Sequence, residues 1–240
     1  MDLFKDPQVA RAWRQGDGIA NWTGLFGAVL LAQVAPINTG RALDLACGAG
    51  YPTIDLADRL GPGVEVVGVD TAEEALNVAR EAAGDRPNVR FEVADASALP
   101  FPDATFALVT CNLGLHLFED QSTALRECRR VLAPGGQTVF TIPLAGTLDE
   151  FWRHFEGVAA DRDLLDRIPL ATRADEATYV AAFQAAGFAD LRPSARWLDF
   201  EFPEATALIG RFPPLQMARR RLPEDVREAV WEEVVARIEA

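Results

Sequence analysis

The chain is short of positive charge, and this shortage excludes several kinds of partner. Its 240 residues carry 23 lysine and arginine side chains against 36 aspartate and glutamate, giving a net charge of −13, and Lys5 is the only lysine. Such a chain repels phosphate backbones and acidic membrane surfaces. We therefore expect no nucleic-acid and no membrane partner, and the sequence leaves the oligomeric state undecided.

Cysteine is scarce, long apolar runs are missing, and we expect no secretory leader. Three scattered cysteines, Cys47, Cys111 and Cys128, form neither a disulfide framework nor a zinc site. No run of about 18 apolar residues predicts a membrane span, and the first 15 residues lack a basic segment followed by an apolar core. These absences predict a cytoplasmic protein.

Apolar strand patterns alternate with helical patterns from residue 41 onward. Strands are expected at 41–46, 64–70, 88–95, 106–112 and 137–143, with helices at 53–60, 72–84 and 122–136 between them. The second helix is expected to open with a capping box of Thr71 and Glu74, and the third to stop at the glycine pair 135–136. Five nearly all-apolar strands separated by helices predict a parallel sheet covered on both faces.

The alternation ends after Pro143. Helices are expected within 147–170, 176–188, 203–212 and 223–240, and an alternating strand at 196–202. No repeat or linker divides the chain. We therefore predict one α/β domain over residues 1–240, a Rossmann-like, doubly wound, mostly parallel sheet with helical additions at both ends. Its predicted parts are an N-terminal helical lid (1–38), a cofactor-binding core (39–145) and substrate-side helices with the last strand (146–240).

A glycine-containing loop follows the first strand, and an acid ends the second. Ligands of open parallel sheets bind at such strand ends, and both dinucleotides and S-adenosylmethionine are candidates for this place. The small residues Ala46, Gly48 and Gly50 are spaced two apart, and Thr53 stands where a dinucleotide loop has its third glycine. The loop therefore favours a ligand without a pyrophosphate.

Four ordered motifs over roughly residues 38–145 resemble the class I S-adenosylmethionine-dependent methyltransferases. They are LDLACGAG, VVGVD, VADASALPFPDATFALVT and RECRRVLAPGGQTVF. The likeness is to the ubiquinone/menaquinone-biosynthesis-type branch, whose members act on small molecules. It implies S-adenosyl-L-methionine as cofactor, S-adenosyl-L-homocysteine as product and a methyltransferase domain. Many members have glycine where Ala46 stands.

The resemblance assigns cofactor contacts residue by residue. Asp44 would lie near the methionine ammonium, Asp70 would accept both ribose hydroxyls, and Asp95 would bind the adenine amino group beside Ala96. The predicted cofactor-binding residues are Asp44, Ala46, Gly48, Gly50, Asp70, Thr71, Asp95, Ala96, Cys111 and Asn112.

The function expected from this resemblance is methyl transfer to a small organic acceptor by in-line displacement, without a metal. Two alternatives stay open: a catalytically silent S-adenosylmethionine-binding protein or assembly partner, and a NAD-dependent oxidoreductase. His116, just past the fourth strand, is the candidate catalytic base, with packing or substrate contact as its alternative role.

Aromatic side chains outside the core pattern are the candidates for the acceptor pocket. They are Trp22, Phe151, Trp152, Phe155, Trp197 and Phe212. Related enzymes close their sheet with a hairpin of strands six and seven. The segment 196–202 looks like the sixth strand, and no strand pattern follows it. We therefore expect the seventh strand to lie outside this sequence or the edge of the sheet to differ.

Overall fold

The computed structural model describes residues 22–165, 174–195, 197, 215, 219–220 and 222–239. Contacts within the chain divide it into two compact units, each of which is described by itself below. Among the described residues, the first unit holds 22–143 and 177–193. The second holds 144–165, 174–176 and the described residues from 194 onward. The expectation of one domain over residues 1–240 stays a prediction.

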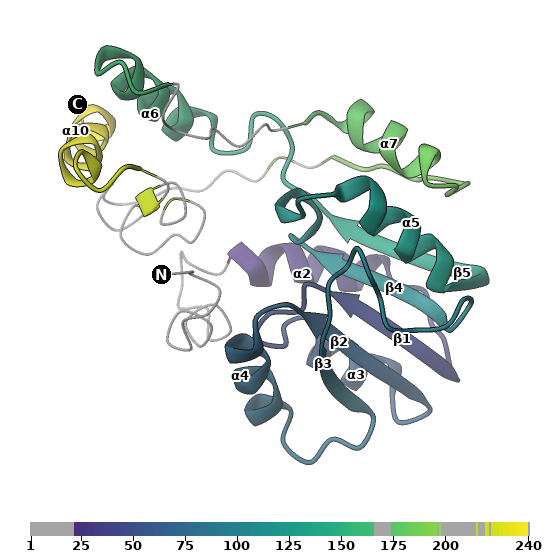
Figure 1. The fold of residues 1–240 in the computed structure, drawn as a ribbon. Helices are drawn as coiled ribbons and strands as arrows, with labels where there is room; N and C mark the ends of the chain where they lie inside the picture. The colour runs from purple at the N-terminus through teal and green to yellow at the C-terminus, as the bar shows by residue number, and fades with distance from the viewer. Residues whose placement is uncertain are drawn as a thin grey trace. The chain divides into compact units, whose positions relative to one another are not determined.

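The first unit is built on a five-stranded sheet with the order β3-β2-β1-β4-β5 (Figure 1). Its strands are β1 (Gly40–Leu45), β2 (Val64–Asp70), β3 (Val89–Val93), β4 (Phe106–Asn112) and β5 (Leu132–Thr141). All four pairings are parallel. The chain winds outward from β1 to β3 and then crosses back to β4. The switch point therefore lies between β1 and β4, where a ligand site is expected at the carboxyl ends.

Alternate strand residues form separate cores on the two faces of this sheet. Leu43 of β1 packs on one face with side chains of α5 (Gln121–Val131). Ala42 packs on the other face with side chains of α2 (Trp22–Gln33) and α3 (Thr53–Leu60). The helix α4 (Glu73–Ala83) joins α3 around Phe91, and α7 (Glu176–Ala185) brings Phe183 against Phe140 of β5. The predicted α/β fold, with a parallel sheet covered on both faces, is confirmed.

The predicted capping box of α4 and the predicted end of α5 are wrong. At α4 the N-cap residue is Ala72, and no side chain caps it, so Thr71 and Glu74 form no capping box. The N–H of Ala72, which the glutamate of a capping box would accept, instead donates to Asp70 Oδ1 at 2.9 Å.

At α5 the helix ends at Val131, before the glycine pair. Leu132 turns extended there because it pairs with Phe106 of β4 and is buried at 6% exposure. Strand pairing therefore outweighs the glycine signal, and the strand begins five residues before the predicted residue 137.

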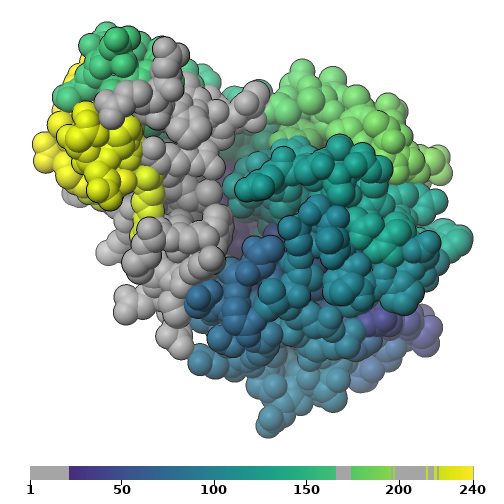
Figure 2. Space-filling model, viewed as in Figure 1, coloured from purple at the N-terminus to yellow at the C-terminus, as the bar shows by residue number. Residues whose placement is uncertain are grey.

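The second unit contains a pair of packed helices, α6 (Asp149–Asp161) and α10 (Arg227–Glu239), which lie side by side in Figures 1 and 2. Phe151 and Phe155 of α6 are buried, as is Trp231 of α10. Ion pairs join the helices at their edges, including Arg237 with Asp161 at 2.7 Å. No helix in the described parts of the chain is long and apolar enough to cross a membrane. Residues 1–21 of the lid expected at 1–38, residues 166–170 of the helices expected within 147–170, the helix expected at 203–212 and nearly all of the strand expected at 196–202 lie outside the described residues.

Candidate cofactor-binding site

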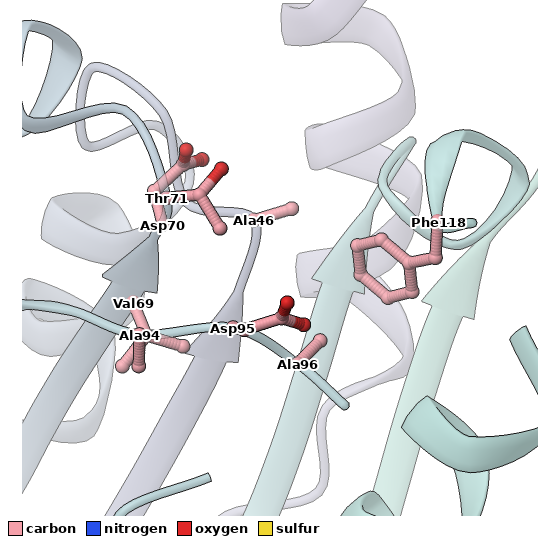
Figure 3. Close-up of a pocket in the computed structure, with 8 residues that line it drawn as sticks. All are labelled: Ala46, Val69, Asp70, Thr71, Ala94, Asp95, Ala96 and Phe118. Carbon is pink, nitrogen blue, oxygen red and sulfur yellow. The ribbon is translucent and has the colours of Figure 1, made fainter. Parts of the chain in front are cut away.

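One pocket of the first unit lies at the carboxyl ends of the strands, as the topology requires (Figure 3). Its walls come from the loop after β1, the end of β2, the segment after β3 and the turn after β4. The lining residues are Ala46, Val69, Asp70, Thr71, Ala94, Asp95, Ala96 and Phe118. Five of the ten predicted cofactor residues, Ala46, Asp70, Thr71, Asp95 and Ala96, therefore lie together around a single pocket.

Asp70 is held by the backbone on both of its carboxylate oxygens. Oδ2 accepts the Gly48 N–H at 2.9 Å, and Oδ1 accepts the Ala72 N–H at 2.9 Å. The glycine is suited to this role because its φ of 51° lies in the left-handed region. Each carboxylate oxygen has two lone pairs and can therefore accept more than one hydrogen bond. The side chain is thus fixed in place and faces the pocket (Figure 3).

Ala46 takes a left-handed conformation that is costly for a residue with a Cβ. Its φ is 52°, and its side chain lines the pocket. A non-glycine residue in this region costs about 1–2 kcal/mol relative to its favoured conformations. A glycine at position 46 would adopt this conformation without that cost.

Asp95 and Ala96 form the wall that follows β3. Asp95 Oδ1 accepts both the Ser97 N–H at 2.8 Å and the Ser97 hydroxyl at 2.6 Å. These bonds, the side-chain one first, lower the pKa of the Asp95 carboxyl below its ordinary 3.8. The carboxyl is consequently ionised at neutral pH and can accept hydrogen bonds from a ligand.

Phe118 is a lining residue that the sequence reasoning missed. It follows the short 3-10 helix η3 (Leu115–Leu117) and lies across the pocket from Asp70 (Figure 3). A turn of this length carries no periodic pattern. The available signal was an aromatic residue close behind the fourth strand, where the topology gathers the ligand-binding loops.

Asp44 lies beneath the loop and is fully buried at 0% exposure. The Thr53 hydroxyl donates to its Oδ2 at 2.6 Å, and the Thr110 hydroxyl donates to its Oδ1 at 2.7 Å. Burial raises the pKa of this carboxyl from 3.8 to about 6, although the two hydroxyl bonds lower it. The structure therefore gives Asp44 two protein partners, and its contact with a methionine ammonium stays a prediction.

Three more of the predicted cofactor residues also have structural contacts of their own. Gly50, with φ of 87°, lies so close to α4 that a Cβ there would meet Ala79 at 3.0 Å. Cys111 is buried, and desolvation raises the pKa of its thiol to about 12. Asn112 donates to the Thr23 carbonyl oxygen at 3.1 Å and accepts the Thr141 hydroxyl at 2.6 Å. Their cofactor contacts stay predictions.

The aromatic candidates for the acceptor pocket fall in both units. Trp22 is buried against Phe26 in the first unit, with ring centroids 4.5 Å apart. In the second unit, Phe151, Trp152 and Phe155 contact one another. Trp197, also in that unit, is 80% exposed, and Phe212 lies outside the described residues. The acceptor pocket stays a prediction.

The charged side chains that line the pocket in Figure 3 indicate the kind of ligand that the pocket suits. Two carboxylates, Asp70 and Asp95, are the charged groups among the described lining residues, and no basic side chain is among them. Carboxylates accept hydrogen bonds from hydroxyl and amino groups and attract positive charge, whereas a pyrophosphate would be repelled. A nucleoside with a cationic substituent, such as S-adenosylmethionine, fits this chemistry. In the described part of the chain, no group of three or more His, Cys, Asp or Glu could hold a metal ion.

Comparisons with known proteins agree with this geometry. The family described as "Methyltransferase domain" matches residues 42–136. A demethylmenaquinone methyltransferase of Deinococcus radiodurans is 43% identical over 117 residues, covering 47% of this chain and 48% of that protein. The chain therefore spans about half the length of this curated relative.

Two solved structures extend the comparison to the fold. Bacillus subtilis YcgJ has a TM-score of 0.61 at 25% identity, covering 86% of this chain and 88% of that one. An arsenic(III) S-adenosylmethionine methyltransferase of Chlamydomonas reinhardtii has a TM-score of 0.52 at 25% identity, covering 77% and 69%. The resemblance found in the sequence is confirmed, because residues 42–136 match the methyltransferase domain family and the chain is similar to methyltransferases over that region.

Proposed function

We propose that the protein is an enzyme that transfers a methyl group from S-adenosylmethionine to a small organic acceptor. The observation that carries the proposal is the arrangement of Asp70, which is anchored on both oxygens and lines a pocket whose described lining residues include no basic side chain. The match of residues 42–136 to a methyltransferase domain supports it. The relative from Deinococcus radiodurans, named for demethylmenaquinone, supports a small-molecule acceptor.

The chain's own residues would bind and orient the cofactor. S-adenosylmethionine, when bound, supplies an electrophilic methyl group on its sulfonium. Asp70 would accept the ribose hydroxyls, and Asp95 with Ala96 would hold the adenine edge. Phe118 would cover the side of the pocket across from Asp70, where an aromatic ring excludes water.

Catalysis then rests mainly on alignment of the acceptor with the methyl group for in-line displacement. Orientation of this kind supplies roughly 7–11 kcal/mol of the barrier. His116, in η3, follows β4 on the same stretch of chain as Phe118. It is our candidate for the base that removes a proton from an acidic acceptor.

Ligand binding tests the cofactor assignment directly. Isothermal titration with S-adenosylhomocysteine should give saturable binding to the wild type, whereas NAD should give none. Asp70→Asn keeps the side-chain shape but removes the charge, so it should weaken binding by about 1.5–3 kcal/mol. Asp58→Asn, a surface acid paired with Arg86 at 2.9 Å, is the matched control and should leave binding unchanged. Binding of NAD but not S-adenosylhomocysteine would contradict the assignment.

Release of S-adenosylhomocysteine tests the methyl transfer. The wild type is incubated with S-adenosylmethionine and a panel of small acceptors, beginning with demethylated quinols and simple phenols and amines. Repeated turnover on one of them is the expected result. A protein that binds S-adenosylhomocysteine but turns over none of a broad panel would favour the silent binder instead.

A further inference from the structure

Arg130 of α5 uses its whole guanidinium group to hold the segment that follows the pocket wall. Nε and Nη2 donate to the two oxygens of Glu127, each at 2.7 Å. Nη1 donates to the Phe101 carbonyl oxygen at 2.7 Å and to Asp103 Oδ1 at 2.9 Å, and Nη2 also donates to the Leu99 carbonyl oxygen at 3.0 Å. All five N–H donors of the guanidinium therefore have an acceptor.

Backbone bonds reinforce the same attachment. Glu127 Oε2 accepts the Leu99 N–H at 2.9 Å, and the Arg130 carbonyl oxygen accepts the Ala104 N–H at 2.9 Å. Leu99 and Phe101 are buried in the core on the α5 face of the sheet. Residues 99–104 are thus fixed to α5 by both polar and apolar contacts.

This segment begins directly where the pocket wall ends. The chain segment that carries the Asp95–Ala96 wall, residues 94–98, starts at Ala94, whose N–H donates to the Asp70 carbonyl oxygen at 3.1 Å. It then turns on itself, because Asp95 accepts from Ser97 through its side chain and from the Ala98 N–H, at 3.0 Å, through its carbonyl oxygen. The next residue is Leu99. One end of the wall is therefore held by β2 and the other by Glu127 and Arg130.

We propose that Glu127 and Arg130 are positioning residues for the cofactor pocket, which act by fixing the Asp95–Ala96 wall in its binding geometry. Neither residue lines the pocket. A wall that is already ordered loses less conformational freedom when a ligand binds, so its contacts contribute more to affinity. The inference rests on the proposed function, since it takes the adenosine part of the cofactor as the ligand that Asp95 contacts.

A double-mutant cycle separates positioning from a merely structural role. Binding of S-adenosylhomocysteine is measured for the wild type, Arg130→Gln, Asp95→Ala and the double variant. Residues that act through one contact are coupled, so Arg130→Gln should weaken binding about tenfold in the wild type and less than about twofold beside Asp95→Ala. Glu127→Gln, which keeps an oxygen for the Leu99 N–H, should weaken binding less than Arg130→Gln.

The matched control is Arg86→Gln. Arg86 also donates to a carboxylate through two bonds, to Asp58 at 2.9 and 3.1 Å, and to the Ala83 carbonyl oxygen. None of these hydrogen bonds goes to a residue of the wall, so the removal of Arg86 should lower the melting temperature without changing binding. An Arg130→Gln variant that behaves the same way, or equal losses in the two Asp95 backgrounds, would overturn the proposal.

Hydrogen exchange provides a readout that needs no ligand. The amides of Ser97, Ala98 and Leu99 should exchange faster in Arg130→Gln than in Arg86→Gln, because only the first change releases the wall. If Arg130→Gln does not fold, Glu127→Gln is measured in its place. Unchanged exchange at these three amides contradicts the inference even if S-adenosylhomocysteine binds. If these amides do exchange faster in Arg130→Gln but the wild type binds no S-adenosylhomocysteine, the result contradicts the proposed function instead.

Discussion

Asp44→Asn should remove a pH dependence of stability that the buried carboxyl imposes on the folded protein. The asparagine amide has the same shape, and it can accept from one hydroxyl and donate to the other, because Thr53 and Thr110 can each do either. The substitution therefore keeps both partners while it removes a charge from a site with no solvent exposure.

The magnitude follows from the displaced pKa. Burial raises the pKa of Asp44 from 3.8 to about 6 in the folded protein, so the folded state binds the proton more tightly than the unfolded chain does. The resulting contribution to stability is fully present below about pH 3.8, falls as the pH rises and is lost above about pH 6. At about 1.4 kcal/mol per pKa unit, the whole loss is about 3 kcal/mol, of which about 1 kcal/mol falls between pH 5 and pH 7.

Urea unfolding at pH 5, 6 and 7 measures this difference. The stability of Asp44→Asn relative to the wild type should rise by about 1 kcal/mol from pH 5 to pH 7. Asp58→Asn is the control, because Arg86 lowers the pKa of that carboxyl and its titration lies below this pH range. Identical pH slopes for Asp44→Asn and the wild type would show that the carboxyl is not held as the structure indicates.

Two further substitutions test the loop and the candidate base. Gly50→Ala should destabilise the protein by about 1–3 kcal/mol more than Gly61→Ala, as thermal unfolding would show. Both glycines have positive φ, but only at Gly50 would a Cβ meet other atoms within 4 Å; equal losses would contradict the close packing. His116→Ala should lower turnover about 10²–10⁴-fold and leave S-adenosylhomocysteine affinity unchanged. Turnover near that of the wild type would remove His116 from the mechanism.

The elements that the sequence predicted with correct bounds share a simple cause. The strands β2 and β4 are apolar runs that end at a polar residue, and α3 is bounded by Pro52 and Gly61. In each case the local pattern and the tertiary contacts agree. At the end of α5 they disagree: the glycines favour a stop at 135–136, but pairing with β4 draws Leu132 out of the helix. Such non-local pairing leaves no mark in a local pattern.

Two aspartates near the ends of neighbouring strands have different surroundings. Asp44 and Asp70 both follow apolar residues in neighbouring strands. Side chains alternate between the faces of a sheet, and Leu43 packs on the α5 face, so Asp44 turns toward the opposite face and meets Thr53 and Thr110. Asp70 is the last residue of β2, where the chain leaves the sheet and the carboxylate reaches the loop amide of Gly48. The position of each acid along its strand therefore decides its role. Asp70 lines the pocket, whereas Asp44 is buried and links α3 to β4 through Thr53 and Thr110.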